Sequence, residues 1–286
     1  MVANDNWLNG YLFANNLNSQ HPAPPKDLFS AQSKEYASSR PTYPQALIEF
    51  IIGLVKDKQL AWDCATGNGQ AAIMLAGHFN KVIASDISAR QIENAIKKDN
   101  VEYRIFPAEN TPLDDNSVDL ITVAQALHWF DFDRFYYEAK RVLKLRKKEG
   151  NASGCGGVIA AWAYGLHTIS PEIDKISYHL YEDILGDKYW PAERKYVEER
   201  YETIPFPFDP ISSPERLQIH LEWTMPELIK YFRSWSSVQK FIEKNRLDPV
   251  NEVRDALEKA WGGKNHINEK KIVVWPLYVK VGTNPE

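Results

Sequence analysis

Cysteine, a secretory signal and long apolar runs are scarce or absent in this chain of 286 residues. The sequence has two cysteines, Cys64 and Cys155, without the spacing of a disulfide framework or a metal site. No apolar run reaches the roughly 18 residues of a membrane-spanning helix, and the N-terminus lacks a basic region followed by an apolar stretch. We therefore expect a protein of the reducing cytoplasm, without a membrane partner.

The sequence also has little excess of charge of either sign. The 34 Lys and Arg residues against 38 Asp and Glu residues give a net charge of −4, so no overall field attracts nucleic acid. The seven histidines show no metal-ligand spacing, and the pair Asp131 and Asp133 has no matching ligand nearby. We expect neither a nucleic-acid partner nor a bound metal. A hydrophobic content of 44% is enough for one large domain, with or without a helical insertion.

What the sequence does contain is a strand, a tight turn and a helix start in residues 60–76. An apolar stretch ends in Asp63, a small-residue turn with Gly67 and Gly69 follows, and residues 71–76 have a helical pattern. This order is typical of a nucleotide-cofactor site in an α/β sheet. Glycine lets the backbone approach a ligand closely because it has no Cβ.

Two cofactors compete for this motif. Residues 67–72 fit the dinucleotide pattern G-x-G-x-x-A, but NAD places a pyrophosphate at the helix N-terminus, where Asp63 would repel it. S-adenosylmethionine (SAM) has no phosphate, and its ammonium and sulfonium charges are favoured by a nearby carboxylate. The motif therefore favours SAM, although an ordinary turn without a ligand stays open on this motif alone.

The next three apolar runs each lead to a polar residue. Residues 81–85 lead to Asp86, 23 residues after Asp63, close to the spacing of about 20 for a ribose-binding acid. Residues 101–106 lead to Glu109, and residues 117–124 lead to Gln125. Repeated strand–helix units of this kind predict a parallel, doubly wound α/β sheet. Since ligands lie beyond the carboxyl ends of such strands, we expect these side chains to converge on one crevice.

The second half of the sequence has a different pattern. We expect a fifth strand at 157–163, helices at 169–185, 226–245 and 248–261, and a sixth strand at 201–206. Residues 271–282 are predicted to form the last strand, and Pro276 within it indicates an edge or a bulge.

Together these motifs resemble the class I SAM-dependent methyltransferases. Residues 63–69 resemble the family's first motif, an acid followed by G-x-G-x-G, with Ala65 in place of the first glycine. That replacement is tolerable if Ala65 does not need a positive φ. The resemblance implies a mostly parallel, seven-stranded Rossmann-like sheet with an antiparallel last strand. It also implies cofactor contacts from Tyr36, Arg40, Asp63, Ala65, Gly67, Gly69, Gln70, Asp86, Ile87, Ala108, Glu109 and Gln125.

Residues 29–30, 36–44 and 126–131 resemble one subgroup, which includes proteins similar to the fungal trans-aconitate methyltransferases. The likeness implies a methyltransferase domain at 29–282 after a polar arm at 1–28. It also implies helical insertions near 167–200 and 214–262 that cover the active site. An apolar stretch within the arm, at 7–13, is a candidate contact with a second subunit of a homodimer.

The subgroup likeness favours methyl transfer to an oxygen of a small carboxylic acid. A carboxylate is ionised at pH 7 and needs no general base, whereas a phenol or an amine would need one. His128 is the candidate for that base, but we prefer a structural role for it. Arg40 is a candidate for binding either the cofactor's carboxylate or the substrate's. The remaining substrate candidates are two arginine anchors and two aromatic walls: Arg194, Arg233, Trp129 and Tyr164.

Two other functions remain open at this point. An NAD(P)-dependent oxidoreductase is disfavoured because Tyr137 is followed four residues later by Arg141 and not by lysine. A non-catalytic SAM-binding protein stays open, because methyl transfer requires no diagnostic catalytic residue.

Overall fold

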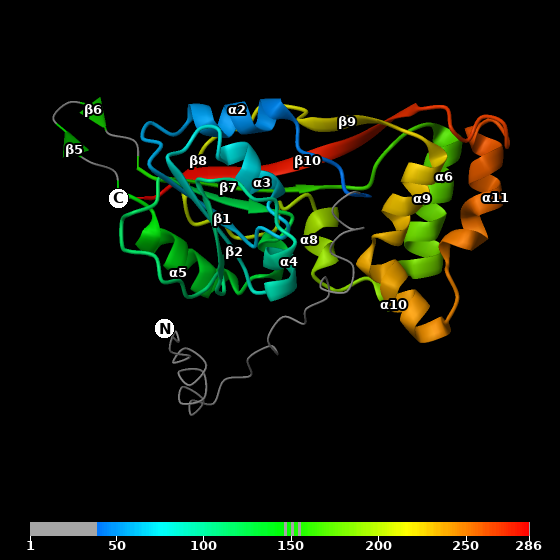
Figure 1. The fold of residues 1–286 in the computed structure, drawn as a ribbon, viewed down its shortest axis with the longest axis horizontal. Helices are drawn as coiled ribbons and strands as arrows, with labels where there is room; N and C mark the ends of the chain where they lie inside the picture. Colours follow the sequence, from blue (N-terminus) through cyan, green and yellow to red (C-terminus); the bar gives the residue numbers. More distant parts are fainter. Residues whose placement is uncertain (1–38, 146–147, 150–151, 154–155, 286) are drawn as a thin grey trace.

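A mostly parallel sheet forms the centre of the molecule (Figure 1). The computed structural model describes residues 39–145, 148–149, 152–153 and 156–285. Its strands β3, β2, β1, β4 and β7 are parallel neighbours, and β10 joins β7 in the antiparallel sense. The predicted fold class is thereby confirmed. The bounds in spatial order are β3 (Val101–Ile105), β2 (Lys81–Asp86), β1 (Leu60–Cys64), β4 (Leu120–Ala124), β7 (Val158–Tyr164), β10 (Lys271–Thr283) and β8 (Asp209–Pro210).

Both faces of this sheet are buried, as its strand sequences require. Side chains alternate along a strand, so Ala61 of β1 packs in one core while Trp62 and Cys64 pack in the other. Helices α2 (Gln45–Gly53) and α3 (Gln70–Leu75) contribute to the first core, and α5 (Phe132–Val142) contributes to the second. Helix α4 (Ala89–Glu93) follows β2, and the Ser88 side chain caps its start.

A group of helices lies beyond one end of the sheet, on the right of Figure 1. The predicted helix at 169–185 is confirmed as α6 (Pro171–Tyr178) and its continuation η3 (His179–Leu185). The predicted helix at 226–245 is instead two helices, because Ser234 and Trp235 break it. The group comprises α6, η3, α7 (Gly186–Tyr189), α9 (Met225–Arg233), α10 (Ser236–Asn245) and α11 (Val250–Trp261). Helix α8 (Arg194–Glu198) lies between this group and the sheet in Figure 1, and its Val197 packs in the second core.

The predicted sixth strand at 201–206 is wrong. Arg200 and Tyr201 have φ angles of 56° and 63°, a left-handed backbone that no extended strand adopts. The strand pairings at this edge come from β8 and from β9 (Gln218–Trp223), both antiparallel to β10. Pro276 is the last residue of β10 that pairs with β9, and the pairing with β7 starts at the next residue, Leu277. A missing N–H is tolerated at such a change of partner.

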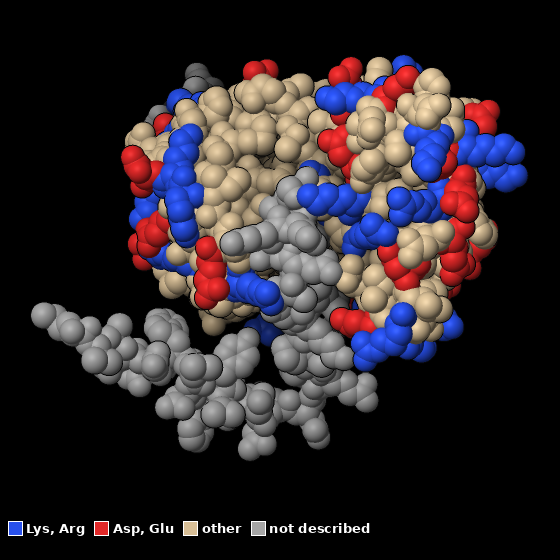
Figure 2. All heavy atoms as spheres, turned by 45° about the vertical axis from the view of Figure 1, so that its right-hand side comes forward, with Lys and Arg blue, Asp and Glu red and all other residues tan. Residues whose placement is uncertain are grey.

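Three smaller elements complete the described chain: η2 (Leu127–Trp129) and the hairpin strands β5 (Lys148–Glu149) and β6 (Ala152–Ser153). None of the described helices combines the length and apolarity needed to cross a bilayer. On the face shown in Figure 2, basic and acidic side chains are interspersed. The predicted arm at 1–28 and Tyr36 lie outside the described residues.

Candidate cofactor and substrate site

The turn between β1 and α3 has the backbone of a ligand cradle. Gly67 and Gly69 have φ angles of 58° and 90°, which favour glycine. A Cβ placed on Gly67 would meet nothing within 4 Å, so this side of the turn faces open space. A Cβ placed on Gly69 would collide with the hydroxyl of Tyr103. The turn is therefore open at Gly67 and tightly packed at Gly69.

Ala65 corrects one expectation about this motif. Its φ is 53°, so the residue that replaces the family's first glycine does need a left-handed backbone. An alanine in that conformation costs roughly 1–2 kcal/mol. The amide of Thr66 donates to the Ser85 carbonyl at 2.9 Å, which ties the start of the turn to β2.

Asp63 lies beneath the turn and not on its surface. The side chain is 0% exposed, and it accepts hydrogen bonds from the Thr122 hydroxyl at 2.7 Å and the Ala72 amide at 3.1 Å. The Thr66 hydroxyl donates to the same carboxylate. Burial raises the pKa of Asp63 to about 6, and these hydrogen bonds oppose that rise. Asp63 is therefore not positioned for the predicted direct contact with the cofactor. Its carboxylate instead links the turn to α3 and β4.

Asp86 ends β2 beside the same turn. Its carboxylate accepts hydrogen bonds from the amides of Gly67 and Ser88, each at 2.9 Å. Glu109 lies beyond β3 and accepts from the Asp131 amide at 3.3 Å. Burial raises the pKa of the Cys64 thiol well above its usual value, and the nearby charges of Glu109, Asp63 and Asp86 add to this effect. The strand-end acids thus do lie close together.

The remaining predicted cofactor residues flank this region. Gln70 is the first residue of α3, and Ile87 follows Asp86 with 48% of its surface exposed. Ala108 is buried beside Glu109. Gln125 follows β4 with a φ of 60°, and its buried side-chain nitrogen has no hydrogen-bond partner among the described residues. An unsatisfied buried amide beside a cavity is typical of a ligand position.

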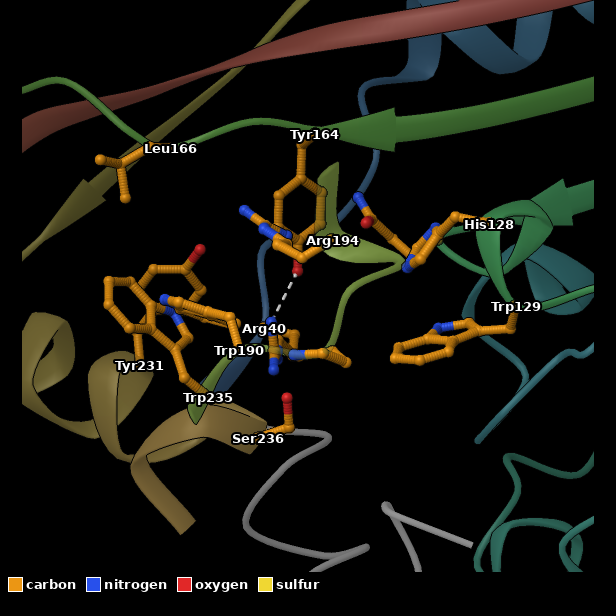
Figure 3. Close-up of a pocket in the computed structure, with 12 residues that line it drawn as sticks. Arg40, His128, Trp129, Tyr164, Leu166, Trp190, Arg194, Tyr231, Trp235 and Ser236 are labelled. Atoms are coloured by element: carbon orange, nitrogen blue, oxygen red, sulfur yellow. Dashed lines mark hydrogen bonds between the residues drawn. The ribbon is translucent and has the colours of Figure 1, made fainter. Parts of the chain in front are cut away.

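A pocket lies between the carboxyl ends of β4 and β7 and the helical group (Figure 3). Six of the predicted residues line it, including Gln125, so the pocket adjoins the strand-end region. Further aromatic walls come from Trp190, Tyr231 and Trp235. The hydrophobic pattern of the sequence does not predict that their segments lie against the sheet. The full lining is Arg40, Gln125, His128, Trp129, Tyr164, Leu166, Trp190, Pro191, Arg194, Tyr231, Trp235 and Ser236.

Two guanidinium groups border this pocket, and none of the described lining residues is acidic. Arg40 donates to the Tyr164 hydroxyl at 3.3 Å and to the Ser234 carbonyl at 2.7 Å. Arg194 donates from Nε to the Tyr181 hydroxyl at 2.7 Å, and its guanidinium lies 5.1 Å from the ring centre of Trp190. The guanidinium of Arg40 lies 5.7 Å from the ring centre of Tyr231, so an aromatic ring lies beside each cation.

Arg194 owes its orientation to a relay that sequence analysis missed. The Tyr181 hydroxyl accepts from Arg194 and donates to Glu198 Oε1 at 2.5 Å. Arg194 forms no ion pair with any carboxylate of the described chain. Tyr181 thus orients this charge without an ion pair, and the terminal nitrogens of Arg194 form no hydrogen bond with the described residues.

His128 is nearly enclosed, with 6% of its surface exposed. Its Nδ1 lies 2.8 Å from the hydroxyl of Tyr201, another residue that sequence analysis missed. Burial and then the Arg194 charge lower the pKa of His128 to about 3. The imidazole is therefore neutral at pH 7 and a weak proton acceptor, which argues against a role as general base.

Arg233 is not brought to the pocket. Its Nε donates to Asp248 at 2.8 Å, and its Nη2 donates to Asn251 at 3.3 Å. The expectation of a carboxylate anchor here is wrong, because α9 points this side chain toward α11 while the neighbouring Tyr231 faces the cavity. No cluster of His, Cys, Asp and Glu in the described chain is arranged to hold a metal.

Comparison with known proteins gives concordant matches. A family whose description is "Methyltransferase domain" matches residues 62–147. A methyltransferase homologue of Dictyostelium discoideum is 38% identical over 273 residues, which cover 92% of this chain and 98% of that protein. The structure of a type II methyltransferase homologue from Anaeromyxobacter dehalogenans superposes with a TM-score of 0.75 at 37% identity, covering 86% of this chain and 98% of that one.

Proposed function

The chain belongs to the class I SAM-dependent methyltransferases, and we propose that it methylates an oxygen of a small carboxylic acid similar to trans-aconitate. One observation carries the proposal: Arg40 and Arg194 border a pocket in which no described lining residue is acidic. These two positive charges would attract an anionic acceptor, whereas an amine in its cationic form would be repelled.

The chemistry of a carboxylate fits the rest of the pocket. SAM supplies an electrophilic methyl group and leaves as S-adenosylhomocysteine (SAH). An ionised acid needs no proton removed before it reacts, so the weak basicity of His128 is no obstacle. The protein's part is then to align the acid and exclude water, and alignment alone can contribute about 7–11 kcal/mol. The rings of Trp190, Trp235 and Tyr231 support this part of the proposal.

The cofactor side of the proposal rests on the turn and its neighbours. Open space beside Gly67, the half-buried carboxylate of Asp86 and the unsatisfied amide of Gln125 fit a bound SAM. In this proposal Asp86 accepts from the ribose hydroxyls, and Ile87, Ala108, Glu109 and Gln70 contact the nucleoside. Arg40 is shared between the two ligands. The helical insertions close over them, and the enzyme acts in the cytoplasm, with or without a second subunit.

Substrate choice is tested with a panel scored by SAH release. The panel contains trans-aconitate, other small di- and tricarboxylic acids, a phenol and a primary amine. We expect an acid to react fastest. Arg194→Ala should raise the KM of that acid about 10- to 100-fold, because a hydrogen bond to a charged group contributes roughly 1.5–3 kcal/mol. The Kd of SAH, measured by calorimetry, should stay unchanged.

Arg233→Ala is the matched control, because it removes the same charge outside the pocket. It should leave the KM of the acid unchanged. A phenol or amine that reacts faster than every acid would contradict the carboxylate proposal, as would an unchanged KM in Arg194→Ala.

A further inference from the structure

The Tyr201 hydroxyl and the His128 ring form a closed contact at the wall of the pocket. Tyr201 is 0% exposed, so the proton of its hydroxyl needs a protein acceptor. Nδ1 of His128, at 2.8 Å, is the side-chain partner that the described chain offers.

Burial decides the direction of this hydrogen bond. Tyr201 is 0% exposed, so water cannot accept the proton of its hydroxyl. If Nδ1–H donated to the Tyr201 oxygen, that proton would have no acceptor among the described residues. The hydroxyl proton has an acceptor only if the Tyr201 O–H donates and Nδ1 of His128 accepts.

A neutral imidazole that accepts at Nδ1 must have its proton at Nε2. Nε2 has no hydrogen-bond partner in the described chain, and His128 lines the cavity together with Arg194 (Figure 3). In this tautomer the only ring nitrogen left for a ligand is a donor. His128 and Arg194 thus present hydrogen-bond donors to the same space.

We propose that His128 binds the acid by donating from Nε2–H to a carboxylate oxygen, and that Tyr201 is the positioning residue that fixes this tautomer. The inference rests on the proposed function for the identity of the ligand, but the tautomer is a property of the protein alone. It assigns the histidine a role in recognition and removes it as a general base, since its lone pair faces Tyr201.

The tautomer is measured by nitrogen NMR of the ligand-free enzyme with labelled histidine. The His128 signal is identified by its loss in His128→Gln. We expect the Nε2–H tautomer in the unmodified enzyme, and a shift toward a mixture of tautomers in Tyr201→Phe. His179→Gln is the matched control, because this exposed histidine pairs with Asp183 and does not line the pocket.

Kinetics with trans-aconitate, or with the fastest acid of the panel, test the donor role. His128→Gln keeps an N–H donor near the position of Nε2 and should hold KM within about threefold. His128→Leu has no donor and should raise KM at least about tenfold, with the Kd of SAH unchanged.

An Nδ1–H tautomer in the unmodified enzyme would overturn the inference, and so would an unchanged KM in His128→Leu. If Tyr201→Phe does not fold, the unmodified enzyme and the two His128 variants still decide the question. Reaction of a phenol or amine in place of every acid would instead refute the proposed function, while the measured tautomer would stand by itself.

Discussion

At the scale of single residues, comparing Gly67 with Gly53 separates the effect of backbone conformation from the effect of steric overlap. Gly67 has a φ of 58° and open space where a Cβ would lie, whereas Gly53 ends α2 without a positive φ and also with open space. Steric overlap with the protein is absent at both positions. Any difference between their alanine variants therefore reports backbone conformation and the ligand.

We expect Gly67→Ala to lower the free energy of unfolding by about 1–2 kcal/mol, the cost of a left-handed alanine. Gly53→Ala should instead stabilise the protein by about 0.5–1 kcal/mol, because alanine favours a helix. Denaturant unfolding measures both changes. Calorimetry with SAH should show at least about tenfold weaker binding for Gly67→Ala alone, since its methyl group enters the space left for the cofactor. Equal SAH affinities in the two variants would mean that this space is not the cofactor's.

The role of residues 63–69 as a cofactor turn could be predicted from the sequence, but the burial of Asp63 could not. The acid at the end of β1 is recognisable as part of the motif, yet Asp63 is buried and bonded to Thr66, Thr122 and Ala72. Thr122 comes from another strand, so the partner that explains Asp63 is 59 residues away in the chain. Local pattern contains no information on such a contact.

At the scale of elements, the strands with continuous apolar runs could be predicted because strands buried on both faces leave that signature. The edge of the sheet could not. The segment after α8 has an aromatic pattern like that of a strand, but Tyr201 turns its ring toward His128 and its backbone into the left-handed region. Helix α9 ends at Arg233, and Trp235 then starts α10 without a side-chain cap, a break that apolar periodicity does not reveal.

Helix α9 has the strongest local start signal among these elements. The Thr224 hydroxyl and the Glu227 carboxylate form a capping box, with the Thr224 amide donating to Glu227 at 2.7 Å. We expect Thr224→Ala to cost about 1 kcal/mol, which lowers Tm by about 2–4 °C in a domain of this size.

Differential scanning calorimetry measures this shift. Thr203→Ala is the control, because the Thr203 hydroxyl bonds Glu199 at an exposed position and caps no helix. Equal Tm values in the two variants would mean that packing alone, and not the capping box, determines the start of α9.

At the scale of the whole molecule, the site combines one predictable half and one unpredictable half. Parallel strands end at one edge of a sheet, so the placement of Asp86, Glu109 and Gln125 along that edge follows from topology. The pocket wall does not, because Arg40 meets Tyr164 across 124 residues and Ser234 across 194 residues. The helical group that supplies Tyr231 and Trp235 has amphipathic helices like those of many folds, and only tertiary packing places them here.

Two buried histidines predict how the stability of the whole molecule depends on pH. Burial lowers the pKa of His167 from 6.5 to about 3, and burial together with the Arg194 charge does the same for His128. Between pH 6.5 and pH 3, both histidines therefore bind a proton in the unfolded chain but not in the folded protein. Their contribution to stability is complete above pH 6.5 and is lost as the pH falls from 6.5 toward 3. Between pH 7 and pH 5 each histidine should lower the free energy of unfolding by roughly 2 kcal/mol.

Asp63 acts in the opposite direction, because its pKa is raised to about 6 and its protonated form is favoured in the folded state. The effect of a single histidine therefore has to be measured as a difference between a variant and the unmodified protein. His167→Gln keeps a polar group beside Ser177, which bonds His167 Nε2 at 3.1 Å, but cannot be protonated. Denaturant unfolding at pH 7, 6 and 5 should show that this variant loses roughly 2 kcal/mol less than the unmodified protein over the interval. His179→Gln, changed at an exposed histidine, should follow the unmodified protein. The centre of the His167 ring lies 5.8 Å, 5.6 Å and 5.9 Å from the ring centres of Tyr231, Phe232 and Trp275. Parallel pH dependences for His167→Gln and the unmodified protein would mean that His167 accepts its proton without disrupting these contacts.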